Sequence, residues 1–66
     1  MSKKFDFCVG DIISYADEIF EVLAVNSSND GGKVAYWHNG VRGDVVTENF
    51  YWSAYGEDCV LVKRAG

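Results

Sequence analysis

The sequence predicts an all-β fold in which five short strands close into a small barrel. Three observations predict it: apolar residues form short runs rich in β-branched side chains, glycines and Asn/Asp clusters separate these runs, and no proline interrupts them. A barrel is favoured over an open sheet because closure removes the exposed strand edges along which sheets aggregate. We expect one domain, 1–66, with residues 1–8 as an N-terminal lead-in segment.

The first two strands are expected in the N-terminal part of the chain. A β-branched segment over residues 11–15 follows a glycine, and residues 16–18 form a short polar turn. Residues 19–25 read IFEVLAV, a run too short and too β-branched to favour a helix, so they are predicted to form the second strand. The next loop, residues 27–32, has strong turn chemistry in its sequence SSNDGG.

The strongest hairpin signal is Asn39-Gly40, which follows the third predicted strand at residues 33–38. A two-residue type I′ turn needs positive φ at both central positions, and Asn-Gly tolerates this best. The return strand is expected over residues 41–46, and Gly43 inside it indicates a bulge or a tight bend.

The segment at residues 48–58, ENFYWSAYGED, holds four of the ten aromatic residues. A single helical turn near residues 47–55 is one alternative for it. A longer helix is disfavoured, because the consecutive rings FYW would cover nearly the whole circumference of a helix. After a further turn, residues 59–63 (CVLVK) are predicted to be the closing strand.

The aromatic side chains are expected to divide between a core and a surface. Neighbours in an extended chain point to opposite faces, so we expect Phe50 and Trp52 inward. Tyr51 and Tyr55 are then expected outward, beside Trp37. A domain of this size cannot bury all ten rings, and an exposed aromatic patch rimmed by charge is typical of a protein-binding surface.

Four stretches resemble SH3-like small barrels, especially those of the Tudor type. They are VGDIISY at residues 9–15, IFEVLAV at 19–25, GKVAY at 32–36 and the Asn39-Gly40 turn, matched in order within residues 9–62. The Gly-Asp before the first strand, the aromatic residue near the start of the second and the Val-x-Tyr of the third carry the resemblance.

The Tudor resemblance implies an aromatic cage for methylated Lys or Arg, which would be held by cation–π attraction to ring faces. By position, Tyr15, Phe20 and Tyr36 resemble the members of that cage. Asn39 stands where such barrels usually carry a further aromatic residue, so the cage is incomplete in this sequence.

The sequence carries no signature of an enzyme. His38 is the one histidine and flanks the hairpin turn, where a surface role is expected. Cys8 and Cys59 lack metal-ligand spacing, and no phosphate loop or dinucleotide fingerprint occurs, so neither cofactor nor metal is expected. The two cysteines are expected as reduced, buried thiols, and the alternative is a disulfide that ties the first segment to the last.

Charge and hydropathy restrict the partners. Ten acidic residues against six basic ones give a net charge of −4, which disfavours plain phosphate-backbone binding. No run of about 18 apolar residues could cross a membrane. Asp6 and Asp11 interrupt what would be the apolar region of a signal peptide, so a cytoplasmic protein is expected.

We therefore expect a non-enzymatic protein-binding module, a small accessory or regulatory factor of the phage or mobile-element kind that acts on a larger host protein. Its partner-binding residues are expected to be Tyr15, Tyr36, Trp37, Arg42, Tyr51 and Tyr55. Its acidic face is expected to comprise Asp17, Glu18, Glu21, Asp44, Glu48, Glu57 and Asp58.

Three alternatives stay open. One is a single-stranded nucleic-acid binder that stacks bases on Tyr36, Trp37, Tyr51 and Trp52 with Arg42 nearby. Another is an acidic inhibitor that imitates DNA with the acidic face, joined by Asp11. The last is a homo-oligomer in which the aromatic patch is only structural.

Overall fold

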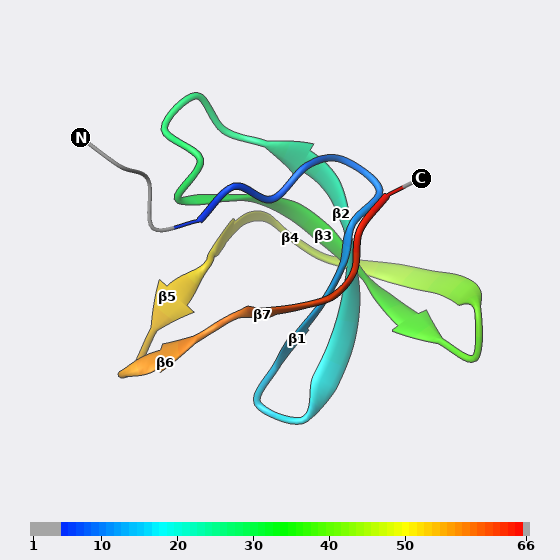
Figure 1. Cartoon of the computed structure of the whole chain (residues 1–66). Helices are drawn as coiled ribbons and strands as arrows, with labels where there is room; N and C mark the ends of the chain where they lie inside the picture. Colours follow the sequence, from blue (N-terminus) through cyan, green and yellow to red (C-terminus); the bar gives the residue numbers. More distant parts are fainter. Residues whose placement is uncertain (1–4, 66) are drawn as a thin grey trace.

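The computed structural model of the protein describes residues 5–65, and all of its regular elements are strands (Figure 1). They are β1 (Ile12–Tyr15), β2 (Glu18–Val25), β3 (Gly31–His38), β4 (Val41–Tyr51), β5 (Ser53–Ala54), β6 (Glu57–Asp58) and β7 (Val60–Lys63). The all-β prediction is confirmed. Within the described range no helix is present, and hence none that could span a bilayer.

β1, β2, β3, β4 and β7 form one antiparallel sheet in the order β4-β3-β2-β1-β7, and β5 and β6 form a separate two-stranded ribbon. The five-stranded sheet is therefore confirmed, but it is open. In residues 5–65 no pairing joins the edge strands β4 and β7, so the predicted closure into a barrel is not shown.

β4 is longer than the sequence suggested. The predicted return strand ended at residue 46, whereas β4 continues to Tyr51, so the helical turn near residues 47–55 is wrong. The strand stays extended because its pairing with β3 continues to the Gly31–Tyr51 pair. The predicted irregularity at Gly43 is present: the register shifts there, and a Cβ on Gly43 would lie 3.3 Å from that of Tyr36.

Two-residue turns with positive φ connect three hairpins. Asn39 and Gly40 have φ of 52° and 80°, which confirms the predicted turn. The Tyr55-Gly56 turn between β5 and β6 has φ of 53° and 74°, and the β1–β2 turn uses Ala16 and Asp17 at 51° and 66°. Ala16 therefore adopts a left-handed conformation that a side chain with a Cβ disfavours.

The double substitution Ala16→Asn, Asp17→Gly is expected to raise the free energy of unfolding by about 1–2 kcal/mol, because Asn-Gly tolerates positive φ at both positions. Urea denaturation followed by circular dichroism measures the change. The matched control is Gly40→Ala, expected to cost about 1 kcal/mol through its φ of +80° alone, since no atom lies within 4 Å of the added Cβ. An unchanged or lower stability for the double variant contradicts the left-handed turn.

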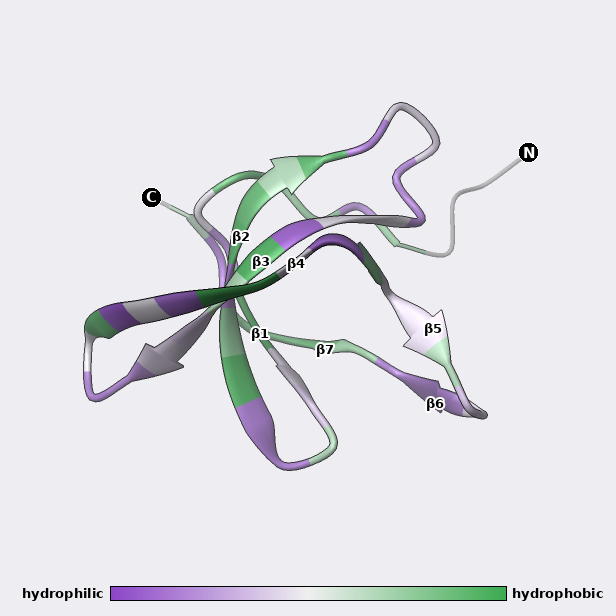
Figure 2. Ribbon diagram, turned by 180° about the vertical axis from the view of Figure 1, so that it is seen from behind, coloured by the Kyte–Doolittle hydropathy of each residue, from purple (hydrophilic) through white to green (hydrophobic). Residues whose placement is uncertain are grey.

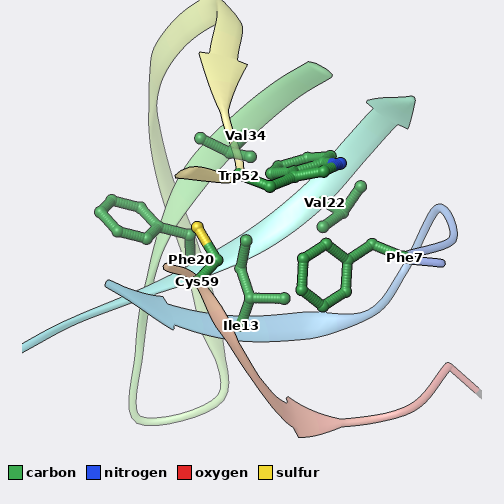
Figure 3. Close-up of a cluster of buried hydrophobic side chains, with 7 residues drawn as sticks. All are labelled: Phe7, Ile13, Phe20, Val22, Val34, Trp52 and Cys59. Atoms are coloured by element: carbon green, nitrogen blue, oxygen red, sulfur yellow. The ribbon is translucent and has the colours of Figure 1, made fainter. Parts of the chain in front are cut away.

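The core lies between one face of the sheet and the segments that cross it (Figure 3). Ile13, Phe20, Val22 and Val34 project from the sheet and meet Phe7, Trp52 and Cys59. Trp52 is fully buried, and its ring contacts Phe7 edge-on with 5.2 Å between centroids. Phe50 packs against the same cluster, so the predicted inward direction of Phe50 and Trp52 is confirmed.

The two ends of the described chain meet at a buried carboxylate, Asp11. One oxygen accepts a hydrogen bond from the backbone N–H of Ala65 at 2.7 Å, and the other accepts from the N–H of Cys8 at 2.9 Å and from Arg64 at 3.1 Å. Arg64 also donates to the exposed carboxylate of Asp6 at 3.3 Å. We call these five residues the Asp11 clasp.

The edge strand β7 is apolar, as Figure 2 shows, although its side chains face solvent. Val60, Leu61 and Val62 are 60, 37 and 55% exposed. An apolar edge strand has main-chain groups on its outer side that another chain can pair with.

Candidate functional site

A groove lies on the face of the sheet opposite the core. Alternation along the strands produces it: Ile13 and Phe20 point into the core, so Ile12 and Ile19 point to the other face, and Trp37 lies on that face as well. We call it the outer groove; it has a volume of about 490 Å³ and is lined by Gly10, Ile12, Ile19, Glu21, Trp37, Gly40, Val62, Lys63, Arg64 and Ala65.

Arg42 borders this groove, because it is the register partner of Trp37 across the β3–β4 pair. Its Nε and Nη2 donate to Oε1 and Oε2 of Glu21 at 2.6 and 3.2 Å. The hydrogen bond to Glu21 and the charge of that carboxylate raise the pKa of Arg42. The Arg42 side chain is 57% exposed and that of Glu21 only 12%, so the pair presents mainly its cationic member to solvent.

A second group of predicted residues gathers where the β1–β2 turn meets the β5–β6 ribbon. The backbone N–H of Ala16 donates to Oε2 of Glu57 at 3.0 Å, and the Tyr15 hydroxyl donates to the carbonyl of Ala54 at 2.7 Å. Desolvation, followed by the charge of Glu57, raises the pKa of Tyr15. This hairpin end carries the predicted residues Tyr15, Asp17, Glu18, Tyr55, Glu57 and Asp58.

Tyr55 is fully exposed and Tyr51 is 53% exposed, so their predicted outward direction is confirmed. They do not both lie beside Trp37. Tyr51 pairs with Gly31 at one end of β3, whereas Trp37 pairs with Arg42 near the other end. Six strand positions correspond to about 20 Å. Asp44 and Glu48 lie along β4, so the predicted acidic residues are spread over several elements of the fold.

The rings expected from the Tudor resemblance lie on the core face of the sheet. Phe20 contacts Tyr36 at a centroid distance of 5.5 Å and Phe50 at 5.2 Å, and Tyr15 contacts Phe50 edge-on at 5.5 Å. Phe20 is only 4% exposed. The Phe50 ring thus contacts both Tyr15 and Phe20.

The polar groups with nucleophilic or basic potential are dispersed. His38 stacks on Tyr36 with 5.9 Å between ring centroids. Both cysteines are free: Cys8 is exposed and lies 3.7 Å from Nη1 of Arg64, whereas Cys59 is buried. Cys8 therefore departs from the expectation of two buried thiols. In residues 5–65 no three His, Cys, Asp or Glu side chains are grouped as a metal would need.

Burial raises the pKa of the Cys59 thiol to about 11, with a smaller contribution from the charge of Asp58. The unfolded chain would lose this proton near its ordinary pKa of 9.0. The contribution of the protonated Cys59 thiol to the free energy of unfolding is therefore complete below about pH 9 and is lost as the pH rises towards 11.

We expect Cys59→Ala to flatten the decline of the free energy of unfolding between about pH 9 and 11, whereas Cys8→Ala retains it. Urea denaturation at a series of pH values measures both slopes. Parallel curves for Cys59→Ala and the wild type would refute the shift in the thiol pKa.

The sequence identified Trp37, Arg42 and Glu21 of the outer groove and its border, but not its apolar walls. Ile12 and Ile19 were given no role in a site, although two adjacent isoleucines at residues 12–13 of one strand must face opposite sides. The contact between Asp11 and Arg64 was not anticipated either, because the two residues lie 53 positions apart in the sequence.

Comparison with protein-family models, with curated proteins and with solved structures gives no significant match. The function is therefore inferred from the groove and its chemistry.

Proposed function

We propose that the protein is a non-enzymatic protein-binding module, and that a partner docks in the outer groove with Trp37 as the main anchor. The observation that carries this proposal is the apolar groove around Trp37 on the face of the sheet that the core does not use. Ile12, Ile19 and Val62 form its apolar walls. Apolar centres with charged rims, anchored by Trp and Arg, are typical of the surfaces that carry most of the binding free energy.

The proposed barrel relationship fits this mode of binding. Four sequential antiparallel strands, β1 to β4, are followed by β7, which returns beside β1. That order supports an open version of the SH3-like, Tudor-type barrel that the sequence resembles. The apolar outer groove favours a protein segment as the ligand, and the protein would then act as a small accessory factor on a larger protein.

The test compares proteins captured from a lysate by the wild type, Trp37→Ala and the control Tyr51→Ala, with quantitative mass spectrometry as the readout. Tyr51 is a partly exposed aromatic residue about 20 Å away along the sheet. A specific partner should be lost with Trp37→Ala and kept with Tyr51→Ala. Calorimetry with the purified partner should then show an affinity loss of about tenfold or more.

Thermal denaturation shows whether Trp37→Ala is still folded. If the folded Trp37→Ala protein captures every partner as well as the wild type does, the outer groove is not the docking surface.

A further inference from the structure

The solvent-facing charges around the outer groove are mainly cationic, although the chain as a whole carries −4. Within residues 5–65 there are four basic residues, and only Lys33 is neither in the groove lining nor at its border. Arg42 is 57% exposed, whereas the carboxylate of Glu21 that it binds is 12% exposed. Arg64 is 44% exposed and binds both the buried carboxylate of Asp11 and the carboxylate of Asp6, whose side chain is 83% exposed. At Arg42, a largely buried carboxylate thus orients a guanidinium whose outer edge faces solvent.

Arg42 is held in a defined position by its two hydrogen bonds to Glu21. These bonds use Nε and Nη2, so the edge that carries Nη1 points away from Glu21. A guanidinium fixed in this way loses little side-chain entropy when it binds a second carboxylate, which it can do with good geometry. Trp37 lies directly across the strand pair, so an anion on Arg42 and an apolar group on Trp37 would be neighbours.

We propose that the partner segment carries an Asp or Glu next to a large aliphatic or aromatic residue. The apolar side chain fills the groove against Trp37 and Ile19, and the carboxylate binds the outer edge of Arg42. This inference rests on the proposed function and adds the chemistry of the partner.

A nucleic acid could in principle place a base on Trp37 and a phosphate on Arg42. The groove walls favour a peptide, because Ile12, Ile19 and Val62 are aliphatic and Trp37 is the single ring of the lining. A nucleic-acid strand also needs a track of cations, since each nucleotide carries a charge. Beyond the groove and its border, the described residues add only Lys33 to such a track.

The experiment selects random linear peptides displayed on phage against the wild type and, in parallel, against Trp37→Ala and Arg42→Gln. The control is Lys33→Gln, which removes one positive charge outside the groove. We expect the wild type and Lys33→Gln to enrich the same motif, an acidic residue beside a large apolar one. Neither Trp37→Ala nor Arg42→Gln should enrich it.

The enriched peptide and its amide version, with Asn or Gln in place of the acidic residue, are then compared by fluorescence anisotropy. Arg42→Gln should weaken binding of the acidic peptide by about tenfold. Binding of the amide version should be nearly unaffected, because that peptide makes no charged hydrogen bond with either the wild type or the variant. Glu21→Gln, Arg42→Gln serves as a second variant in which no unpaired carboxylate is left behind. It should show the same loss for the acidic peptide.

The outcomes separate the two proposals. A neutral or basic motif that requires Trp37 overturns the partner chemistry and leaves the protein-binding function in place. Enrichment that does not require Trp37, or no enrichment, overturns both. Trp37-dependent binding of an oligo-dT probe overturns the peptide in favour of a nucleic acid, and a Trp37-dependent dimer by light scattering overturns it in favour of a second copy.

Discussion

Asp11→Ala is expected to lower the free energy of unfolding by about 3–5 kcal/mol. The Asp11 carboxylate is fully buried and accepts two backbone N–H bonds and one from Arg64. Its removal leaves those N–H groups without an acceptor and the guanidinium without its buried partner. A domain of this length has a total stability of roughly 3–10 kcal/mol, so the variant is expected to be largely unfolded at room temperature.

Urea denaturation followed by circular dichroism measures this loss. Asp6→Ala is the matched control, because Asp6 binds the same arginine but its side chain is 83% exposed. That substitution is expected to cost less than about 1 kcal/mol. If the two variants have the same stability, the Asp11 clasp does not hold the ends of the sheet together.

Trp52→Ala is expected to have a comparable effect, a loss of about 3–5 kcal/mol. The Trp52 ring is fully buried between Phe7 and Phe50, with ring centroids at 5.2 and 6.5 Å. Its Nε1 also donates to Oδ1 of Asn29 at 3.1 Å. Alanine would leave a cavity beneath the lead-in segment and remove this link to the β2–β3 loop.

The controls for Trp52 are the neighbouring tyrosines. Tyr55→Ala and Tyr51→Ala are expected to change the free energy of unfolding by less than about 0.5–1 kcal/mol, since Tyr55 is fully exposed and Tyr51 is half exposed. Urea midpoints of the three variants decide the ranking. A Tyr55→Ala protein as unstable as Trp52→Ala would mean that the rings divide between core and surface differently.

Most strands and turns could be predicted from the local sequence. The errors arose where tertiary contacts determine the conformation or burial of a segment. Asn39-Gly40 favours its turn wherever it stands, so the hairpin was predictable. Residues 47–51 lack a strong pattern of their own, and their pairing with β3 keeps them extended. Phe7 was expected in a lead-in segment, but it is buried because its ring packs in the core cluster against Trp52.

The candidate site was predictable in part. Trp37 and Arg42 flank a predicted hairpin turn, so their neighbourhood could be inferred from the turn alone. The direction of Tyr36 and the distance between Trp37 and Tyr51 depend on register shifts within the β3–β4 pair. Such shifts move side chains along and across the sheet, and no periodicity in the sequence specifies where they occur.

The Asp11 clasp also bears on the order in which the chain folds. Asp11 is separated from Arg64 by 53 residues and from Ala65 by 54, whereas the hairpins of the sheet join near neighbours. Loop-closure entropy favours the near contacts first, so we expect the hairpins to form early and the clasp to form last. A chain still being synthesised can assemble β1 to β4, but it cannot form the hydrogen bonds of the Asp11 clasp before Arg64 and Ala65 have been added. Substitutions in the clasp should therefore speed unfolding and leave the folding rate almost unchanged.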